Sequence, residues 1–289
     1  MFYRKLIVLL SVVCFAAASW AGWELTAVTK AESQQRGANA MNTTVKLQVN
    51  GDKSRADFTE SKNPMIGKDS YLVTRDGGKT AYMVNTKEKT YMKWDMAQMA
   101  GLAGQMTKMM QMKVTSPKVE KLLEEPGEKM VGFPTTHYRY RTSYTMETSF
   151  MGKKTSQSTV QEQDVWSTTE IGDLGMGLWL KKEGIKTGDA SLDDLMKAHM
   201  EQIKGLPLKQ ITVTTTKDNK GKENVSKMTM EVTHLVKANP SDSLFEMPAD
   251  YKETSMFGGA EGEGSGGEGN DGQPRKGQIP FMKMFQGGK

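Results

Sequence analysis

Apolar and polar residues alternate along much of this chain, and that pattern constrains the fold more than any other feature. Val45, Leu47 and Val49 alternate with polar residues and lead into Asn50-Gly51, a pair typical of a tight β-hairpin turn. Similar strand-like runs occupy 70–94 (three runs forming a meander), 135–150, 157–166, 208–216 and 225–235. The sequence therefore predicts at least eight strands, mostly antiparallel.

Two helices are expected between these strands. The first should begin after Asp95, which can cap it, and its apolar residues recur at spacings of three and four as far as Met110. The second should run from a cap at Ser191 to Gly205. Strands dominate, so we expect a mainly β (α+β) fold: a strongly curved, unclosed antiparallel sheet, or half-barrel, with helices covering its concave face.

The first 21 residues have the features of a secretory signal peptide. Arg4 and Lys5 precede an apolar run over 6–18, and small residues flank Trp20 before a cleavage site near Ala21. The run is short for a membrane helix of about 20 residues, although a retained anchor is the alternative interpretation. We therefore expect a periplasmic or secreted protein with no retained transmembrane segment, and a folded domain over 22–252.

Residues 253–289 differ in composition from the rest of the chain. The stretch 257–278 is rich in glycine and predicts a disordered, flexible tether, because it has too little apolar surface to offset the entropy of ordering. An apolar cluster, Ile279–Phe285, follows it. This cluster is either an unused end or a docking peptide, for an envelope protein partner or for the domain's own groove.

No motif for catalysis, metal binding or cofactor binding is present. The sequence contains no HExxH, GxSxG or phosphate-loop pattern, and His137, His199 and His234 lack metal-ligand spacing. The single cysteine, Cys14, lies in the predicted signal peptide. The formal net charge is +5, and the lysines and arginines are spread along the chain without forming a block. Nucleic acid is therefore not an expected partner. We expect a protein that is not an enzyme and needs no cofactor or metal.

Methionine is unusually abundant, at 23 residues. Several methionines lie along the first predicted helix, where they could cover a groove for apolar ligands, fill the core or bind Cu(I) through their thioethers. Tyrosines on the 135–150 strand fall on the face opposite His137, and Trp166 would join their layer if the two strands are neighbours. The candidate cavity or lid residues are Met96, Met99, Met106, Met110, Tyr138, Tyr140, Tyr144 and Trp166.

An ordered set of motifs spans nearly all of the predicted domain: DGGKTAYMVNTKEKTYMKW (76–94), PGEKMVGFPTTHYRYR (126–141), DVWSTTEI (164–171), KGLPLKQITV (204–213) and SLFEMPADYK (243–252). This set resembles the LolA/LolB-like periplasmic lipoprotein-carrier superfamily, and more closely its uncharacterised bacterial relatives. The resemblance implies an unclosed, curved sheet with helices as a lid, an apolar cavity and no catalytic activity. The methionine-rich helix and the glycine-rich tail depart from the carriers' pattern.

These observations lead to one leading hypothesis and two alternatives. The leading one is a non-enzymatic extracytoplasmic protein that encloses an apolar ligand such as an acyl chain or a lipid-modified partner. The first alternative is copper handling by the methionine-rich segment. The second is a structural envelope protein that binds other proteins through its surface.

Overall fold

The computed structural model describes residues 22–33, 41–63, 66–171, 190–201 and 204–254. The predicted signal peptide (1–21) lies outside the described residues. So does the tail from residue 255 onward, including Ile279–Phe285.

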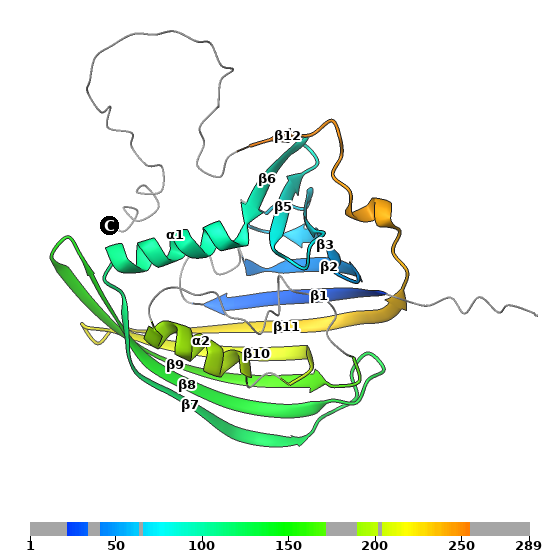
Figure 1. Ribbon diagram of the computed structural model, residues 1–289. Coiled ribbons are helices and arrows are strands. Elements are labelled where there is room, and N and C mark those ends of the chain that lie inside the picture. Colours follow the sequence, from blue (N-terminus) through cyan, green and yellow to red (C-terminus); the bar gives the residue numbers. More distant parts are fainter. Residues whose placement is uncertain (1–21, 34–40, 64–65, 172–189, 202–203, 255–289) are drawn as a thin grey trace, which may run out of the picture.

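Strands make up most of the described chain and form one sheet of 12 strands (Figure 1). The strands are β1 (Gly22–Ser33), β2 (Thr43–Asn50), β3 (Lys53–Ser61), β4 (Ser70–Thr74), β5 (Thr80–Asn85), β6 (Thr90–Asp95), β7 (Lys113–Pro126), β8 (Thr136–Phe150), β9 (Lys153–Thr168), β10 (Leu206–Asp218), β11 (Glu223–Ala238) and β12 (Lys252–Glu253). The mainly β fold predicted from the alternation is confirmed. β1, β7 and the short β12 are additions to the predicted set.

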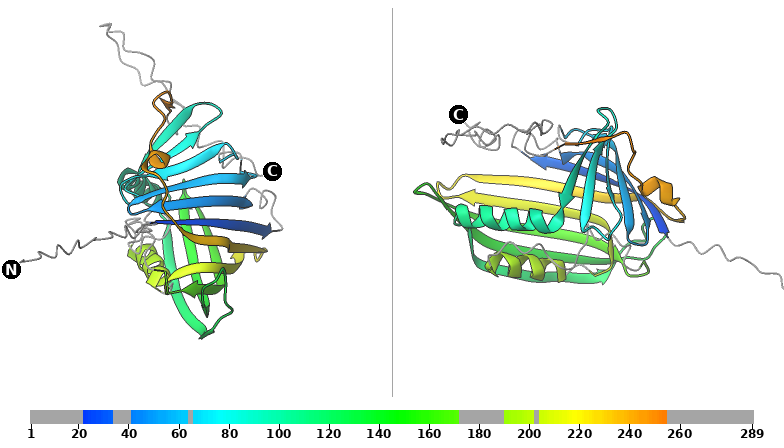
Figure 2. Two further views of the ribbon diagram at one scale, coloured as in Figure 1. Left: turned by 90° about the vertical axis from the view of Figure 1, so that its right-hand side faces the viewer. Right: turned by 45° about the horizontal axis from the view of Figure 1, so that its top comes forward.

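The sheet consists of two meanders joined side by side. Its order is β12-β6-β5-β4-β3-β2-β1-β11-β10-β9-β8-β7, so each half follows the chain and β1 pairs with β11 where the halves meet. Only the short β12 pairs in parallel, with β6. β12 and β7 are the two edges of the sheet, which curves strongly without closing, as predicted (Figures 1 and 2).

The register places the main hydrophobic cluster on one side of the sheet, which we call the core face. Leu25 on β1 lies between Leu47 on β2 and Leu235 on β11. The same side continues through Leu72 and Met83 on β4 and β5. Because side chains alternate between faces, all these buried residues belong to one continuous apolar layer.

A smaller cluster holds the end of the domain against the opposite face. Phe245, in the short helix η2 (Asp242–Phe245), is fully buried against Tyr71, Val73 and Val84. The Arg55 guanidinium lies 3.6 Å from the centre of the Tyr71 ring and donates to the Leu244 carbonyl at 3.2 Å. These contacts make the chain as far as η2 an integral part of the fold.

Helix α1 (Met96–Met109) connects the two ends of the sheet. Asp95 caps it as predicted, since its carboxylate accepts hydrogen bonds from the backbone N–H groups of Ala97 and Gln98. The N terminus of α1 continues directly from β6, and just past its C terminus the Met110 carbonyl accepts from Ser149 N on β8 at 2.9 Å. The helix therefore spans from β6 to β8, as Figure 1 shows.

Helix α2 (Ala190–Glu201) contacts the edge strand β7. It begins at Ala190, so Ser191 lies in its first turn and not at the predicted cap position. Leu195 is its buried apolar residue among those whose side chains are described. The second predicted helix is thus confirmed with a shifted start.

The loop between β4 and β5 is built around Asp76. Its carboxylate accepts hydrogen bonds from the Thr74 hydroxyl and from the backbone N–H groups of Lys79 and Thr80, at 2.9–3.1 Å. Burial alone would raise the pKa of Asp76, but these hydrogen bonds outweigh it and lower the pKa below its ordinary value.

Replacing Asp76 with alanine should destabilise the fold by about 1–3 kcal/mol at pH 7, because three donors lose their acceptor. The folded-state pKa is below the unfolded one, so this contribution is complete above pH ~4 and is lost as the pH falls through the folded-state value. Urea unfolding at pH 7 and at pH 3 should therefore show a smaller difference between D76A and wild type at pH 3. Asp52→Ala, in the exposed β2–β3 turn, is the control and should change stability by less than about 0.5 kcal/mol. A D76A effect equal to that of D52A would contradict the prediction.

Candidate functional site

Two of the predicted tyrosines form a stacked pair on the core face. The rings of Tyr138 and Tyr140 are 5.9 Å apart and nearly parallel, at 13°. Both side chains are buried, whereas Tyr144, further along β8 on the same face, is half-buried. The prediction that the tyrosines share a face opposite His137 is confirmed by the register.

Trp166 does not join this layer, so that expectation is wrong. In the β8–β9 pairing Tyr138 lies opposite Val165, and Trp166 lies opposite His137. The indole ring stacks on the His137 imidazole with 4.2 Å between centroids and an angle of 2°. Lys209 Nζ lies 4.9 Å from the indole centre. Trp166 therefore lies beside polar side chains on the opposite face, and its partly buried ring also packs against the main hydrophobic cluster.

The tyrosine pair lies in a dry and partly polar region. Burial is the main cause that raises the pKa of Tyr140 to about 12, helped by nearby Tyr138 and Glu124. Lys204 Nζ lies 5.8 Å from the Tyr138 ring centre. The Tyr140 phenol is therefore a neutral hydrogen-bonding group at physiological pH.

The core face changes character from one half of the sheet to the other. On β1 to β6 its buried side chains are mainly apolar. On β8 to β10 it also carries buried polar side chains: Thr142, Thr159, Gln163 and Thr212. A molecule lying along this face would meet mainly hydrocarbon over β1 to β6, with the Trp94 indole N–H as a donor there, and several more hydrogen-bonding groups over β8 to β10.

The methionines predicted on the first helix lie at the margin of the core. Met96, Met99, Met106 and Met110 are half-buried. Neither core cluster of the described residues includes a side chain of α1, and Thr107 is its buried residue. Leu102 and Met109 are exposed. Met96 and Met99 therefore lie at the end of α1 that follows β6, whereas Met106 and Met110 lie toward the end that is hydrogen-bonded to β8.

Trp94 is not among the candidate residues predicted from the sequence. It lies on the core face of β6, opposite Ala81, one residue before the cap of α1. Its indole Nε1 is buried, and no hydrogen-bond partner for it exists among the described residues. A buried N–H without an acceptor costs about 1–3 kcal/mol. The alternation of Met92 and Trp94 just before the cap Asp95 was a sequence signal that Trp94 lies on the core face. Nothing in the sequence indicated that its indole N–H would be unpaired.

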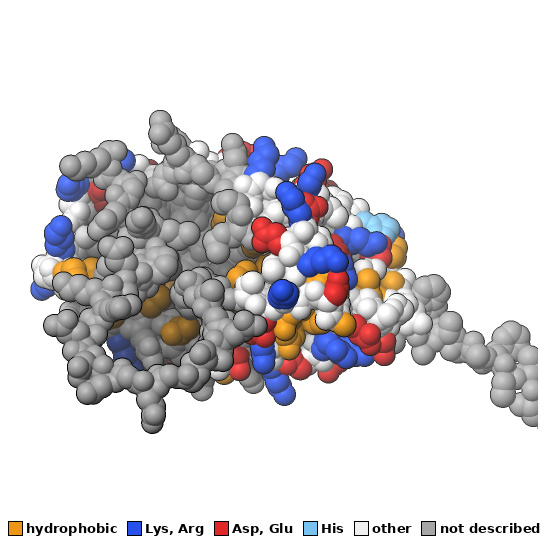
Figure 3. All heavy atoms as spheres, turned by 90° about the horizontal axis from the view of Figure 1, so that it is seen from above, with side chains coloured by type: hydrophobic (Ala, Val, Ile, Leu, Met, Phe, Trp, Pro, Cys, Tyr) orange, Lys and Arg blue, Asp and Glu red, His pale blue; other side chains and the backbone are white. Residues whose placement is uncertain are grey.

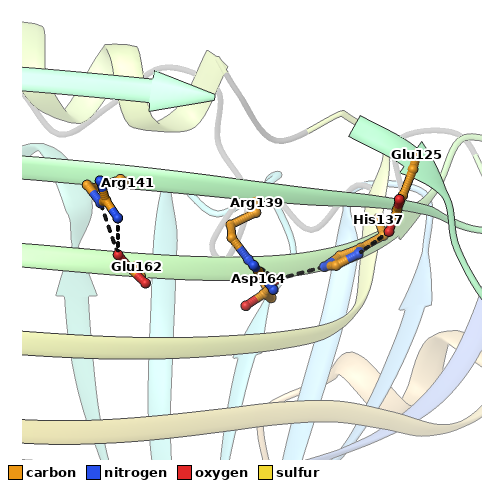
Figure 4. A network of polar contacts seen from close by, with 6 residues as sticks. All are labelled: Glu125, His137, Arg139, Arg141, Glu162 and Asp164. Carbon is orange, nitrogen blue, oxygen red and sulfur yellow. Dashed lines mark hydrogen bonds and ion pairs between the residues drawn. The ribbon is translucent and has the colours of Figure 1, made fainter. Parts of the chain in front are cut away.

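The opposite face of β7 to β9 carries a network of charged side chains (Figure 4). Asp164 Oδ1 lies 2.7 Å from His137 Nε2 and accepts from Arg139 Nε at 2.8 Å. His137 Nδ1 lies 3.3 Å from Glu125 Oε1. Arg141 and Glu162 form a separate pair at 2.6 Å. These cross-strand pairs help to fix the register of β7, β8 and β9, and this structural role accounts for them without invoking a catalytic one.

Asp164→Ala should destabilise the protein by about 1–2 kcal/mol, because it removes the acceptor shared by His137 and Arg139 in a partly buried position. The matched control is Glu162→Ala, which breaks only the Arg141 pair. The Asp164 side chain is 23% exposed and that of Glu162 is 46% exposed, so the control should cost less than about 0.5 kcal/mol. Urea midpoints at pH 7 measure both, and equal losses would contradict the ranking.

A cavity of about 580 Å³ lies at the ends of β1, β2 and β3. Most of the residues that line it have polar side chains, among them Lys30, Glu32, Thr44, Glu60 and Lys62. None of the predicted candidate residues lines it. The cavity is broadly open and offers no convergent set of buried polar groups, so we do not place the site there.

Among the described residues, no helix is long and apolar enough to span a membrane. The same residues contain no group of three or more His, Cys, Asp or Glu side chains that could hold a metal ion. Seen from above, the described surface mixes acidic, basic and hydrophobic side chains (Figure 3).

The fold and its core face define a β-rich protein built on one large unclosed sheet. The family described as "Domain of unknown function (DUF4412)" matches residues 33–251, and the chain belongs to that family. No curated protein matches. A solved structure of PNGF-II in space group P21 aligns at 15% identity with a TM-score of 0.24, covering 81% of this chain and 31% of that one. A similarity this low carries no argument about fold or function.

Proposed function

We propose that this protein is a non-enzymatic binding protein that holds an apolar ligand between the core face of the sheet and α1. The ligand has a hydrogen-bond acceptor that pairs with the indole N–H of Trp94. An acyl chain with its carboxylate or ester group, or the acyl group of a lipid-modified partner, has this combination. In this proposal α1, and with it α2, covers the concave side of the sheet.

The unpaired indole N–H is the observation that carries the proposal. Among the described residues Trp94 Nε1 is the buried side-chain polar atom without a partner. Native proteins satisfy most such groups, and exceptions occur where a ligand supplies the missing partner. Trp94 packs against the main hydrophobic cluster and, on the core face, lies opposite Ala81 and next to Met92. An acceptor there would be poorly solvated, which strengthens its hydrogen bond to the indole.

The position of α1 supports the same proposal. The helix is held at its ends, by continuity with β6 and by the Met110–Ser149 hydrogen bond, while all of its residues except Thr107 are half-buried or exposed. Its methionines are unbranched and can adapt to chains of different shape. A helix fixed at its ends and loosely packed between them can accommodate an apolar guest.

The cellular setting is part of the proposal. The predicted signal peptide places the protein in the periplasm or outside the cell, and the resemblance to LolA/LolB-like carriers leads independently to an apolar ligand. We therefore favour a lipid-binding role over copper handling or a purely structural role.

Ligand binding can be tested with the purified full chain and a fluorescent fatty acid. We expect saturable uptake by the wild type, with loss of affinity by about 5- to 100-fold in Trp94→Phe, which removes the donor but keeps an aromatic ring. Trp166→Phe is the control, because that indole lies on the opposite face, and it should bind like the wild type. Absence of uptake by the wild type, or equal losses in both variants, would overturn the proposal.

A further inference from the structure

The last described residues leave the domain beside the start of α1. β12 pairs with β6 in parallel, with Lys252 opposite Thr90 and Glu253 opposite Tyr91. Thr254 N then donates to the Tyr91 carbonyl at 2.8 Å. Because β6 ends at Asp95 and leads directly into α1, the chain leaves in the direction of that helix. Four residues of β6 separate this exit from α1, which is about 13 Å.

The apolar cluster Ile279–Phe285 can reach every part of α1. About 24 residues separate Thr254 from Ile279, and a glycine-rich coil of that length has a root-mean-square span of about 25–29 Å. Helix α1 has 14 residues and is therefore about 21 Å long. A tether of this kind gives the cluster a local concentration in the millimolar range near the helix.

One side of α1 offers an apolar surface of matching size. Met99, Leu102, Met106 and Met109 follow one another at spacings of three and four, so they lie along one side of the helix. Met99 and Met106 are half-buried, and Leu102 and Met109 are exposed. Lys108 is the one charged residue within the helix. We call these four residues the α1 stripe.

We propose that Ile279–Phe285 docks on the α1 stripe of its own chain. The cluster supplies Phe281, Met282, Met284 and Phe285, whose side chains would cover Leu102 and Met109. The exit of the chain beside α1 and the matching tether length favour this segment over a separate partner. The inference concerns the outer surface of α1 and does not depend on a ligand on the core face.

Methionine oxidation by dilute peroxide, read by peptide mass spectrometry, tests the docking in the full chain. Met109 is 60% exposed in the described domain, and Met151, in the β8–β9 turn, is 81% exposed. Docking predicts that Met109 oxidises several-fold more slowly than Met151 in the wild type. In the double variant Phe281→Ser/Phe285→Ser the rate at Met109 should rise several-fold, while the rate at Met151, the internal control, stays unchanged.

A variant on the helix provides the reciprocal test. Leu102→Lys changes an exposed side chain and should leave the fold intact, which circular dichroism checks. It should release the cluster, so that Met282 and Met284 oxidise several-fold faster than in the wild type. The proposal is overturned if Met109 is unaffected by the tail variant, or if its protection depends on protein concentration, which would indicate a second copy as the occupant.

Discussion

The pairing of β1 with β11 is the interaction on which the rest of the structure depends. It joins two meanders that are each locally connected, and it does so between residues about 200 positions apart in the chain. Closing so long a loop is entropically costly, so the contact must bury substantial apolar surface in return. Leu25 meets this need because it packs between Leu47 and Leu235 in one layer. Without this seam, each half would present a second unpaired edge.

The seam also determines how the core face is divided. Apolar strands β1 to β6 lie on one side of it, and strands with buried threonine and glutamine lie on the other. Because β6 and β7 are at or near the two edges, the connection between the halves must cross from one end of the sheet to the other. Helix α1 makes that crossing, and this explains why it is held mainly at its ends.

Alternation and capping predicted much of this fold, while the site depended on details that they do not contain. Alternating runs such as 45–49 were sufficient to predict strands, and the cap at Asp95 was sufficient to predict the start of a helix. β7 escaped notice because Pro117 and many charged residues interrupt its pattern, as is typical of an edge strand. The face of Trp166 was predicted wrongly because, across the two-residue turn Met151-Gly152, even-numbered residues of β8 pair with odd-numbered residues of β9. Tyr138 therefore pairs with Val165 and not with Trp166. A one-residue difference in that turn would have reversed the faces.

Three unrelated features lie along β6 and α1. The indole N–H of Trp94 is buried without a described partner, the α1 stripe leaves Leu102 and Met109 exposed further along the helix, and β12 directs the end of the domain toward the start of α1. The first two reduce the stability of the isolated domain, because a polar group lacks its hydrogen bond and apolar surface contacts water. Residues that cost stability are expected where binding restores it. Strand β6 and helix α1 are therefore the part of this fold where a ligand and the chain's own tail would have the largest effect.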